Sequence, residues 1–382
     1  MTLLPSQRHS WEIPREVAYF NCAYMSPLSR EVVAAGAAGL AAKARPWELT
    51  PASFFASSEE LRGLYGELLG VDREGIALVP SVSYGMGIAT ANLPLAAGAN
   101  VVVPAEEFPS SVHAWRRAAR AAGAELRAVP RPADGDWTRA LEAAIDARTA
   151  VVCASHVHWV CGGMLDLARV SRAAKAVGAA LVLDLTQSIS VVDPDIAACD
   201  PDFVVAAGYK WLMGPYSLGL LYVAPRHRSG APLEEGWIVR EGAHDFARLV
   251  DYRDEYLPGA RRFDVGERSN FALVPAAIAA CRALLGWPRA DLAETLGAMT
   301  AEIADRTRPL GARALSVPLR APHYLGLTFE RGLPEGLVGR LAAEGVYVSV
   351  RGDRLRVTPH LYNDEHDLER LVGALARALQ GA

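Results

Sequence analysis

The chain has 382 residues, 51% of them hydrophobic, and a formal net charge of −4, so it is long enough to bury a large core and a smaller second unit. No run of like charge predicts a nucleic-acid surface or a polybasic membrane patch, and no apolar stretch approaches the roughly 20 residues that a membrane-spanning helix needs. The five cysteines are widely spread without a C-x-x-C pair and no signal peptide is recognisable, which together indicate a cytoplasmic protein with reduced thiols and no metal site.

Short apolar runs alternate with alanine-rich helical patterns over the first part of the chain. We expect seven strands, at 76–79, 101–103, 126–129, 151–154, 181–183, 203–205 and 218–223. Between most of them lie helical patterns, such as those at 111–122, 138–146 and 167–177. This alternation predicts right-handed crossovers and a mainly parallel sheet. The last two strands are joined too tightly for a helical crossover, so one of them is expected to run antiparallel.

The rhythm changes after Pro288. A long helix is expected at 292–307, followed by strands near 324–329, 346–350 and 354–357 and a final helix at 365–380. The whole chain therefore reads as an α/β protein with two domains. We expect a large domain at 21–287, a smaller α+β domain at 288–382, and an N-terminal segment at 1–20 that packs against the smaller domain.

Two residues at predicted strand ends can carry chemistry. Asp184 ends the strand AALVLD and Lys210 follows the strand FVVAA, and in an open parallel sheet ligands bind at the carboxyl ends of strands. A carboxylate there needs a cation or a strong donor, unless it only caps a turn. A lysine near the core has its charge disfavoured, which frees the amine to attack an aldehyde, unless it extends to solvent. The only other lysines, Lys43 and Lys175, fall in polar-faced helical patterns.

The chain resembles the class V family of pyridoxal-phosphate (PLP)-dependent aminotransferases over nearly its whole length. The motifs that carry the resemblance are the D-x-x-Q step at 184–187 and the GYKWL-GP run at 208–215, and they point to the branch of cysteine desulfurases and isopenicillin N epimerase. The resemblance implies a fold-type I architecture with pyridoxal 5′-phosphate as cofactor. It also implies two catalytic residues: Lys210 as the Schiff-base lysine, and Asp184 as the partner of the pyridine nitrogen.

The resemblance assigns further cofactor contacts. The segment PSVSYG at 80–85 follows a strand and opens a helix, whose N-terminus can bind a phosphate. Phe108 lies where the family places a ring over the cofactor, and Trp159 and Gln187 fall near its phenolic oxygen. The expected cofactor-binding residues are Val82, Ser83, Phe108, Trp159, Asp184, Gln187, Tyr209, Lys210 and Ser269.

The substrate and the partner subunit are implied in the same way. The segment LRVTPHLYN at 355–363 resembles the family's carboxylate-binding strand, and the fork of Arg356 suits an α-carboxylate. Tyr24 and His158 are expected to contact the substrate as well. The segment RRFDVGERSNF at 261–271 resembles one that reaches into the neighbouring subunit, so a homodimer with shared active sites is implied, with Ser269 crossing between subunits.

The sequence also departs from the family pattern. Ala207 stands where many relatives carry a phosphate-binding Ser or Thr, and Tyr209 stands where desulfurases often have His. No cysteine lies between Leu325 and Arg356, where desulfurases carry their sulfur-accepting thiol. We therefore expect an enzyme that acts on a small amino acid through a Cα carbanion, by transamination, by β-elimination as a C–S lyase, or by epimerisation.

Two interpretations from other classes stay open. One is a non-catalytic relative that kept the fold, against which the joint presence of Asp184, Gln187, Lys210 and Arg356 argues. The other is a nicotinamide-dependent oxidoreductase, suggested by the parallel sheet and by GMGIAT at 85–90. That motif has Thr90 in place of the last glycine, which makes it a weak match.

Overall fold

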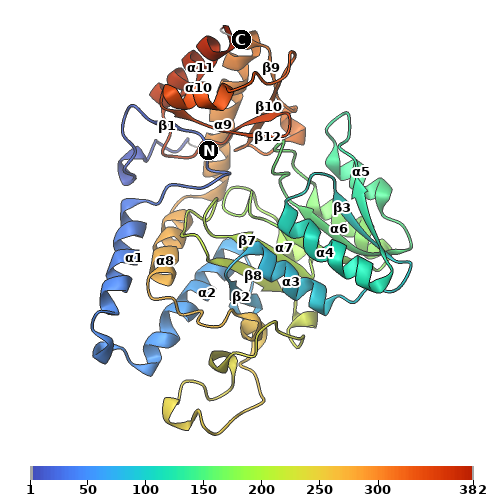
Figure 1. Ribbon diagram of the computed structural model, residues 1–382, viewed down its shortest axis with the longest axis vertical. Coiled ribbons are helices and arrows are strands. Elements are labelled where there is room, and N and C mark those ends of the chain that lie inside the picture. Colours follow the sequence, from blue (N-terminus) through green and yellow to red (C-terminus); the bar gives the residue numbers. More distant parts are fainter. Residues whose placement is uncertain (1–2, 381–382) are drawn as a thin grey trace.

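The computed structural model describes residues 3–380 and is built around one central sheet (Figure 1). Seven strands form this sheet, in the order β2-β8-β7-β6-β5-β3-β4. Their bounds are β2 (Ile76–Val79), β3 (Asn100–Pro104), β4 (Glu125–Val129), β5 (Thr149–Ser155), β6 (Ala180–Asp184), β7 (Phe203–Ala207) and β8 (Gly219–Val223). All neighbours are parallel except β8, which is antiparallel to both β2 and β7. The expected mainly parallel seven-stranded sheet is confirmed, and so is the antiparallel strand after the tight connection.

Helices cover both faces of this sheet. Their bounds are α1 (Arg30–Ala42), α2 (Ala56–Leu69), α3 (Val82–Asn92), α4 (Pro109–Ala122), α5 (Trp137–Ala144), α6 (Leu167–Ala176), α7 (Ile196–Cys199) and α8 (Leu273–Leu285). Alternate strand residues enter two separate clusters: Leu78 and Val204 pack with α2, α5, α6 and α8, whereas Val79 and Val205 pack with α3 and α4. Because both faces are buried, the strands read as nearly continuous apolar runs.

The helices next to the strand ends begin and end at capping residues. The Ser81 hydroxyl accepts a hydrogen bond from the Tyr84 amide at the start of α3, and Asp166 caps α6 in the same way. α4 begins at Pro109, whose fixed φ suits a first helical position, and ends at Gly123 with φ +67°. These caps fix where each strand-end turn stops and its helix starts.

The C-terminal part forms a second layer structure, at the top of Figure 1. It consists of α9 (Arg289–Thr307), β9 (Ala312–Arg313), β10 (Leu325–Phe329), α10 (Leu337–Ala343), β11 (Val346–Tyr347), β12 (Ser349–Arg351), β13 (Arg354–Val357) and α11 (Glu365–Gln380). Four strands pair in the order β12-β13-β10-β9, over a core of their own. The single strand expected at 346–350 is wrong in one respect, because the segment divides between two sheets: β11 pairs with β1 (Ala18–Tyr19), and β12 pairs with β13.

The N-terminal segment lies against this C-terminal part. β1 is parallel to β11, and Asn21 forms an isolated bridge with Thr358. The division of the chain at 287/288 stays a prediction. Among residues 3–380, no helix combines the length and the apolar character that crossing a membrane requires.

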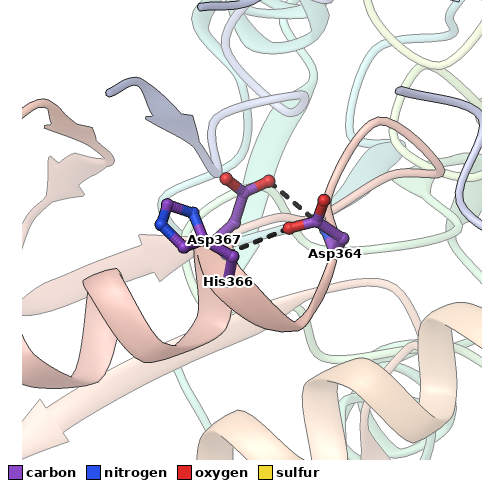
Figure 2. Close-up of side chains that lie close together, drawn as sticks. All are labelled: Asp364, His366 and Asp367. Carbon is purple, nitrogen blue, oxygen red and sulfur yellow. Dashed lines mark hydrogen bonds between the residues drawn. The ribbon is translucent and has the colours of Figure 1, made fainter. Parts of the chain in front are cut away.

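Three polar side chains gather at the start of α11 (Figure 2). The Asp364 amide donates to Asp367 Oδ2 (3.3 Å), and the Asp367 amide donates to Asp364 Oδ1 (3.2 Å). Asp367 also forms an ion pair with Arg8 (2.6 Å). Helix capping and this ion pair explain why Asp364, His366 and Asp367 lie together, since the buried carboxylate is already neutralised.

Candidate active site

A cavity of about 370 Å³ opens at the carboxyl ends of the parallel strands. Its walls come from the segments that follow β2, β3, β5, β6 and β7 and from the segment that leads into β8. This edge of the sheet is where open α/β proteins bind ligands. Eight residues expected to contact a cofactor line the cavity, namely Val82, Ser83, Phe108, Trp159, Asp184, Gln187, Tyr209 and Lys210.

Asp184 ends β6 and its carboxylate is buried, with 3% of the residue exposed. Its Oδ1 accepts a hydrogen bond from the Thr186 amide (2.8 Å), and its Oδ2 accepts one from the Ser111 hydroxyl (3.3 Å). Burial raises the pKa of Asp184 despite these donors. No ion pair neutralises it among the described residues, so this carboxylate is ready to receive a cationic or protonated group.

Lys210 follows β7 and is 6% exposed. Its Nζ lies 5.0 Å from the ring centroid of Phe108 and 5.3 Å from that of Tyr209, and it has no hydrogen bond or ion pair to another residue between 3 and 380. Burial lowers the pKa of Lys210 to about 8, an effect that Asp184 opposes and Arg356 reinforces. The neutral amine is therefore accessible close to neutral pH, as a nucleophile or a proton acceptor requires.

The N-terminus of α3 forms one end of the cavity. The Ser81 hydroxyl caps the helix and lies 2.9 Å from the Ser83 hydroxyl. The amides of Val82 and Ser83 belong to the first turn, whose N–H groups have no partner inside a helix. Such amides and the helix dipole favour an anion such as a phosphate. Ala207 lines the same cavity and adds no hydroxyl to it.

Gln187 is held in one orientation by its neighbours. The Trp211 indole donates to Gln187 Oε1 (2.8 Å), and Gln187 Nε2 donates to the Ala23 carbonyl (3.1 Å). Because an indole can only donate, the amide nitrogen must face the other side. One N–H of Gln187 is then left for a ligand in the cavity. His323 Nε2 lies 2.6 Å from the main-chain carbonyl oxygen of Gln187 and bonds to it.

Aromatic rings form much of the remaining wall. Phe108 and Trp159 meet edge to face with their ring centroids 5.3 Å apart. The ring centroids of Tyr209 and Tyr216 are 4.5 Å apart. The Trp159 indole donates to the Glu106 carbonyl (2.6 Å), which fixes its ring relative to the loop after β3. These rings suit a flat ligand and limit the access of water to it.

Arg356 lies on β13 and is 1% exposed. Its Nε and Nη2 both donate to the Ser349 hydroxyl (3.0 and 2.8 Å), and its Nη1 donates to the Trp159 carbonyl (3.1 Å) and the Tyr324 hydroxyl (3.3 Å). All of these acceptors are neutral, and Arg356 forms no ion pair within residues 3–380. A buried guanidinium without a counter-ion favours a carboxylate ligand beside it.

The loops around the cavity carry backbone strain and a buried acid. Glu106, Met213 and Ser217 have φ values of 58°, 53° and 66°, in the left-handed region that only glycine adopts easily. Glu107 is 5% exposed. Its carboxylate accepts hydrogen bonds from the Ser155 amide (2.9 Å), the Ser155 hydroxyl (2.8 Å) and the amide of Phe108 (2.7 Å). Glu107 thereby ties the loop after β3 to the end of β5, and strain of this kind is common at functional sites.

The structure does not bring His158 to the cavity. Its ring stacks on Trp137 with centroids 4.6 Å apart, its Nε2 bonds the Ala105 carbonyl (3.0 Å), and its Nδ1 lies 3.5 Å from Cys161 Sγ. His158 is therefore a buried structural histidine with both ring nitrogens engaged, and it has no nitrogen left for a substrate.

Three other expected site residues, Arg356, Ser269 and Tyr24, do not line the cavity of their own chain. Ser269 donates its hydroxyl to the Phe54 carbonyl and accepts a hydrogen bond from Ser58 (3.4 Å), so its contribution to a neighbouring subunit stays a prediction. Tyr24 is 51% exposed and follows Ala23, whose carbonyl binds Gln187. Its predicted contact with the substrate is likewise untested.

Several lining residues were not predicted from the sequence. They are small hydroxyl residues and one tyrosine, mostly in the segments between strands and helices: Ser110, Ser155, Thr186, Tyr216 and Ser217. Thr186 lies inside the DLTQS motif, and its hydroxyl accepts a hydrogen bond from the Ala207 amide (3.1 Å). Its position two residues after Asp184 was the sequence feature that could have identified it as a lining residue. The others follow no pattern that marks them apart from ordinary turn residues.

Comparisons with known proteins agree with this geometry. The family model described as aminotransferase class-V matches residues 48–239. Isopenicillin N epimerase of Streptomyces clavuligerus is 28% identical over 349 residues, which cover 85% of this chain and 84% of that protein. A cysteine desulfurase of Enterobacter sp. is 33% identical over 164 residues, which cover 43% of this chain and 38% of that protein.

The fold is shared with solved structures over its whole length. The apo structure of the cysteine desulfurase from Thermococcus onnurineus NA1 superposes with a TM-score of 0.86 at 18% identity and covers 100% of both chains. At this identity the likeness concerns the fold alone.

Proposed function

Because the chain belongs to the aminotransferase class-V family, a family of PLP-dependent enzymes, we propose that it binds an α-amino acid and moves the proton on its Cα. The observation that carries the proposal is that Lys210 and Asp184 both line one cavity. Both charged groups are buried, and neither forms an ion pair with a residue between 3 and 380. Burying such groups without partners is costly unless a ligand compensates them.

The side chains around the cavity fit the cofactor. We assign the aldehyde to Lys210, the protonated ring nitrogen to Asp184 and the phosphate to the amides of Val82 and Ser83. Phe108 supplies an aromatic surface, and the remaining N–H of Gln187 suits a phenolic oxygen, as the hydrogen bonds of its amide allow. When bound, PLP supplies an electron sink that makes the Cα proton of an amino acid acidic.

The chain's own residues then divide the work. Lys210, with its pKa lowered to about 8, accepts the Cα proton and returns it. Arg356 binds the α-carboxylate and so fixes the direction of the Cα–H bond, which is an orientation effect. The carboxylate of Asp184 would accept a hydrogen bond from the protonated ring nitrogen and so keep that nitrogen protonated. Trp159 and Phe108 exclude water.

Borohydride reduction of the holoenzyme followed by peptide mapping tests this proposal. We expect the pyridoxyl label on Lys210 and none on Lys43 or Lys175, which are both exposed. The variant Lys210→Ala is the matched control and should take up no label. A label on Lys43 or Lys175, or an unlabelled chain in PLP-loaded protein, contradicts the assignment.

Transamination is the reaction that we propose first, and β-elimination and epimerisation begin with the same proton removal. The outcome depends on where the proton returns and on whether a group leaves from Cβ. A panel of amino acids distinguishes the three reactions: transamination gives a keto acid without free ammonia, elimination gives a keto acid together with ammonia and sulfide or another leaving group, and epimerisation gives the opposite enantiomer.

We also propose a cytoplasmic homodimer with shared active sites. The segment 261–271 supports this, because Glu267 and Asn270 are exposed on it while Arg268 is buried and bound to Asp264 (2.7 Å). An anchored segment with an exposed tip is suited to reach a second subunit.

A further inference from the structure

One face of the β12–β13 pair carries a row of arginines. In the antiparallel register, Ser349 is opposite Arg356 and Arg351 is opposite Arg354. Residues directly opposite each other in a ladder share a face. The same side of this hairpin therefore carries Arg351, Arg354 and Arg356. On that side the Ser349 hydroxyl accepts two hydrogen bonds from Arg356.

Among residues 3–380, Arg354 is the one arginine of the three that has an acidic neighbour. Arg354 Nε lies 3.5 Å from Asp353 Oδ1, whose carboxylate also accepts hydrogen bonds from Arg131 (2.9 and 3.1 Å). Arg351 and Arg356 form no ion pair with any residue between 3 and 380. Two positive charges are thus left without a counter-ion near the amine of Lys210, whose pKa both of them lower.

Trp159 connects both unpaired arginines to the cavity. The guanidinium carbon of Arg351 lies 5.7 Å from the Trp159 ring centroid, and that of Arg356 lies 5.8 Å from it. Trp159 itself lines the cavity and contacts Phe108, over which the Lys210 amine lies. Neither arginine lines the cavity itself, but both guanidinium groups lie beside Trp159, one of the residues that form its wall.

The two arginines differ in how much of their hydrogen bonding is already used. Four contacts to neutral acceptors occupy Arg356, as described above. Arg351 donates only from Nη1 to the Val350 carbonyl (2.7 Å) and is half-buried. An arginine has five N–H donors, so Arg351 keeps most of its fork free for a ligand. Burial and the charge of Arg356 lower the pKa of Arg351, which an anion would reverse.

We propose that the amino acid substrate carries a second anionic group on its side chain, which Arg351 binds while Arg356 binds the α-carboxylate. This inference rests on the proposed function and names the substrate class for the same cavity. A carboxylate, a sulfonate or a phosphate offers the paired oxygens that a guanidinium fork binds.

Binding of unreactive acids to the holoenzyme tests the second anchor directly. Glutarate carries two carboxylates and butyrate carries one, so calorimetry should show glutarate binding about 10- to 100-fold more tightly, as expected for one additional charged pair. Arg351→Gln should remove this preference, and Arg351→Lys should restore part of it. Arg354→Gln is the matched control, because Arg354 shares the face but already has an acidic neighbour, and it should keep the preference.

Turnover separates the possible anions. We expect kcat/KM to be higher for aspartate or glutamate than for asparagine or glutamine, which have the same shape, and Arg351→Gln should abolish the difference mainly through KM. Cysteate and O-phosphoserine show whether a sulfonate or a phosphate is preferred over a carboxylate.

Two results would overturn the inference without contradicting the proposed function. Equal binding of glutarate and butyrate to holoenzyme that carries the borohydride label on Lys210 removes the second anchor and leaves the proposed function standing. An equal loss of both acids in Arg351→Gln shows that Arg351 binds the α-carboxylate instead. Absence of the label contradicts the proposed function itself, and the substrate class falls with it.

Discussion

Lys210 makes the apoprotein less stable at neutral pH than it would be with an apolar residue. The folded protein holds the pKa of Lys210 at about 8, below its ordinary value of 10.5. Below pH 8 the amine is charged in both states, so its burial cost is fully present. Between pH 8 and 10.5 the folded state loses the proton first, the unfolded state binds more protons, and stability rises with pH.

Lys210→Met should therefore stabilise the PLP-free protein at pH 7, by up to about 3 kcal/mol. The difference in unfolding free energy between this variant and the wild type should shrink as the pH is raised from 8 toward 10.5. Urea unfolding of both proteins across that range measures it. Lys175→Met provides the comparison, because Lys175 is exposed and paired with Asp200 (3.2 Å), and its gap should not follow this pH course. A stability difference for Lys210→Met that is independent of pH would rule out the burial argument.

Arg356→Ala should weaken amino-acid substrates while leaving PLP binding intact. The loss of a charged hydrogen-bond partner typically amounts to about 1.5–3 kcal/mol, which corresponds to roughly 10- to 150-fold in kcat/KM, and misorientation of the substrate adds to it. Arg356→Lys should recover only part, since an ammonium cannot form the two-pronged contact. The cofactor spectrum and kcat/KM of each variant decide the matter, and an unchanged kcat/KM with bound PLP would move the carboxylate contact to another arginine.

Cys22 should not act as a sulfur acceptor, although it lies beside Lys210, the lysine to which we assign the cofactor aldehyde. Its Sγ lies 4.0 Å from the Lys210 carbonyl, but the side chain is fully buried and burial raises the pKa of the thiol. Sulfur transfer needs a thiolate on an accessible segment. Cys22→Ala should leave any turnover of cysteine unchanged, with sulfide appearing in solution rather than a persulfide on the chain. Fast cysteine turnover that this substitution abolishes would refute the prediction.

At the scale of elements, the close packing of α3 on β7 positions the amides of Val82 and Ser83, to which we assign the phosphate. A Cβ added to Gly85 would lie 2.5 Å from Val205 Cγ1, so Gly85→Ala should push α3 away from the sheet. We expect a loss of about 1–3 kcal/mol in unfolding free energy, together with weaker PLP binding. Gly63→Ala in α2 is the matched control, because nothing lies within 4 Å of its Cβ position, and it should stabilise by about 0.5–1 kcal/mol. Equal effects of the two substitutions would contradict the packing argument.

The sequence predicted the elements that have a strong pattern and missed those that lack one. Buried strands read as apolar runs, so all seven central strands were found, and with them Asp184 and Lys210 at their ends. α1 was not predicted, because its REVVAAGAAGLAA sequence is almost uniform and only Val32 is buried on it. β1 and β9 have two residues each and carry no period of their own.

The candidate site was predictable where motifs mark it and not where it depends on three-dimensional proximity. Arg351 gains its possible role only from lying beside Trp159, which is 192 positions away in the sequence. His158 follows a strand as the other site residues do, but its ring turns to Trp137 and away from the cavity. A strand-end position predicts the neighbourhood of a side chain and leaves its direction open.

For the whole molecule, we expect a dimer whose interface includes exposed apolar side chains. Trp47 and Tyr252 are 77% and 94% exposed, and an interface that covered them would remove apolar surface from water. Light scattering of the purified protein at assay concentrations should give twice the chain mass. Dilution below the dissociation constant should lower activity and dimer content together, because each site would take residues from both subunits. A fully active monomer would exclude shared sites.

The pairing of β1 with β11 has a consequence for how the protein is made. Ala18 pairs with Val346, and the loop after β1 brings the Ala23 carbonyl to Gln187 at the cofactor cavity. A ribosome must therefore synthesise almost the entire polypeptide before the N-terminal strand can find its partner. Contacts between such distant positions form late in folding, because closing a long loop costs chain entropy. The nascent chain should consequently load its vitamin-derived cofactor only after translation is nearly complete.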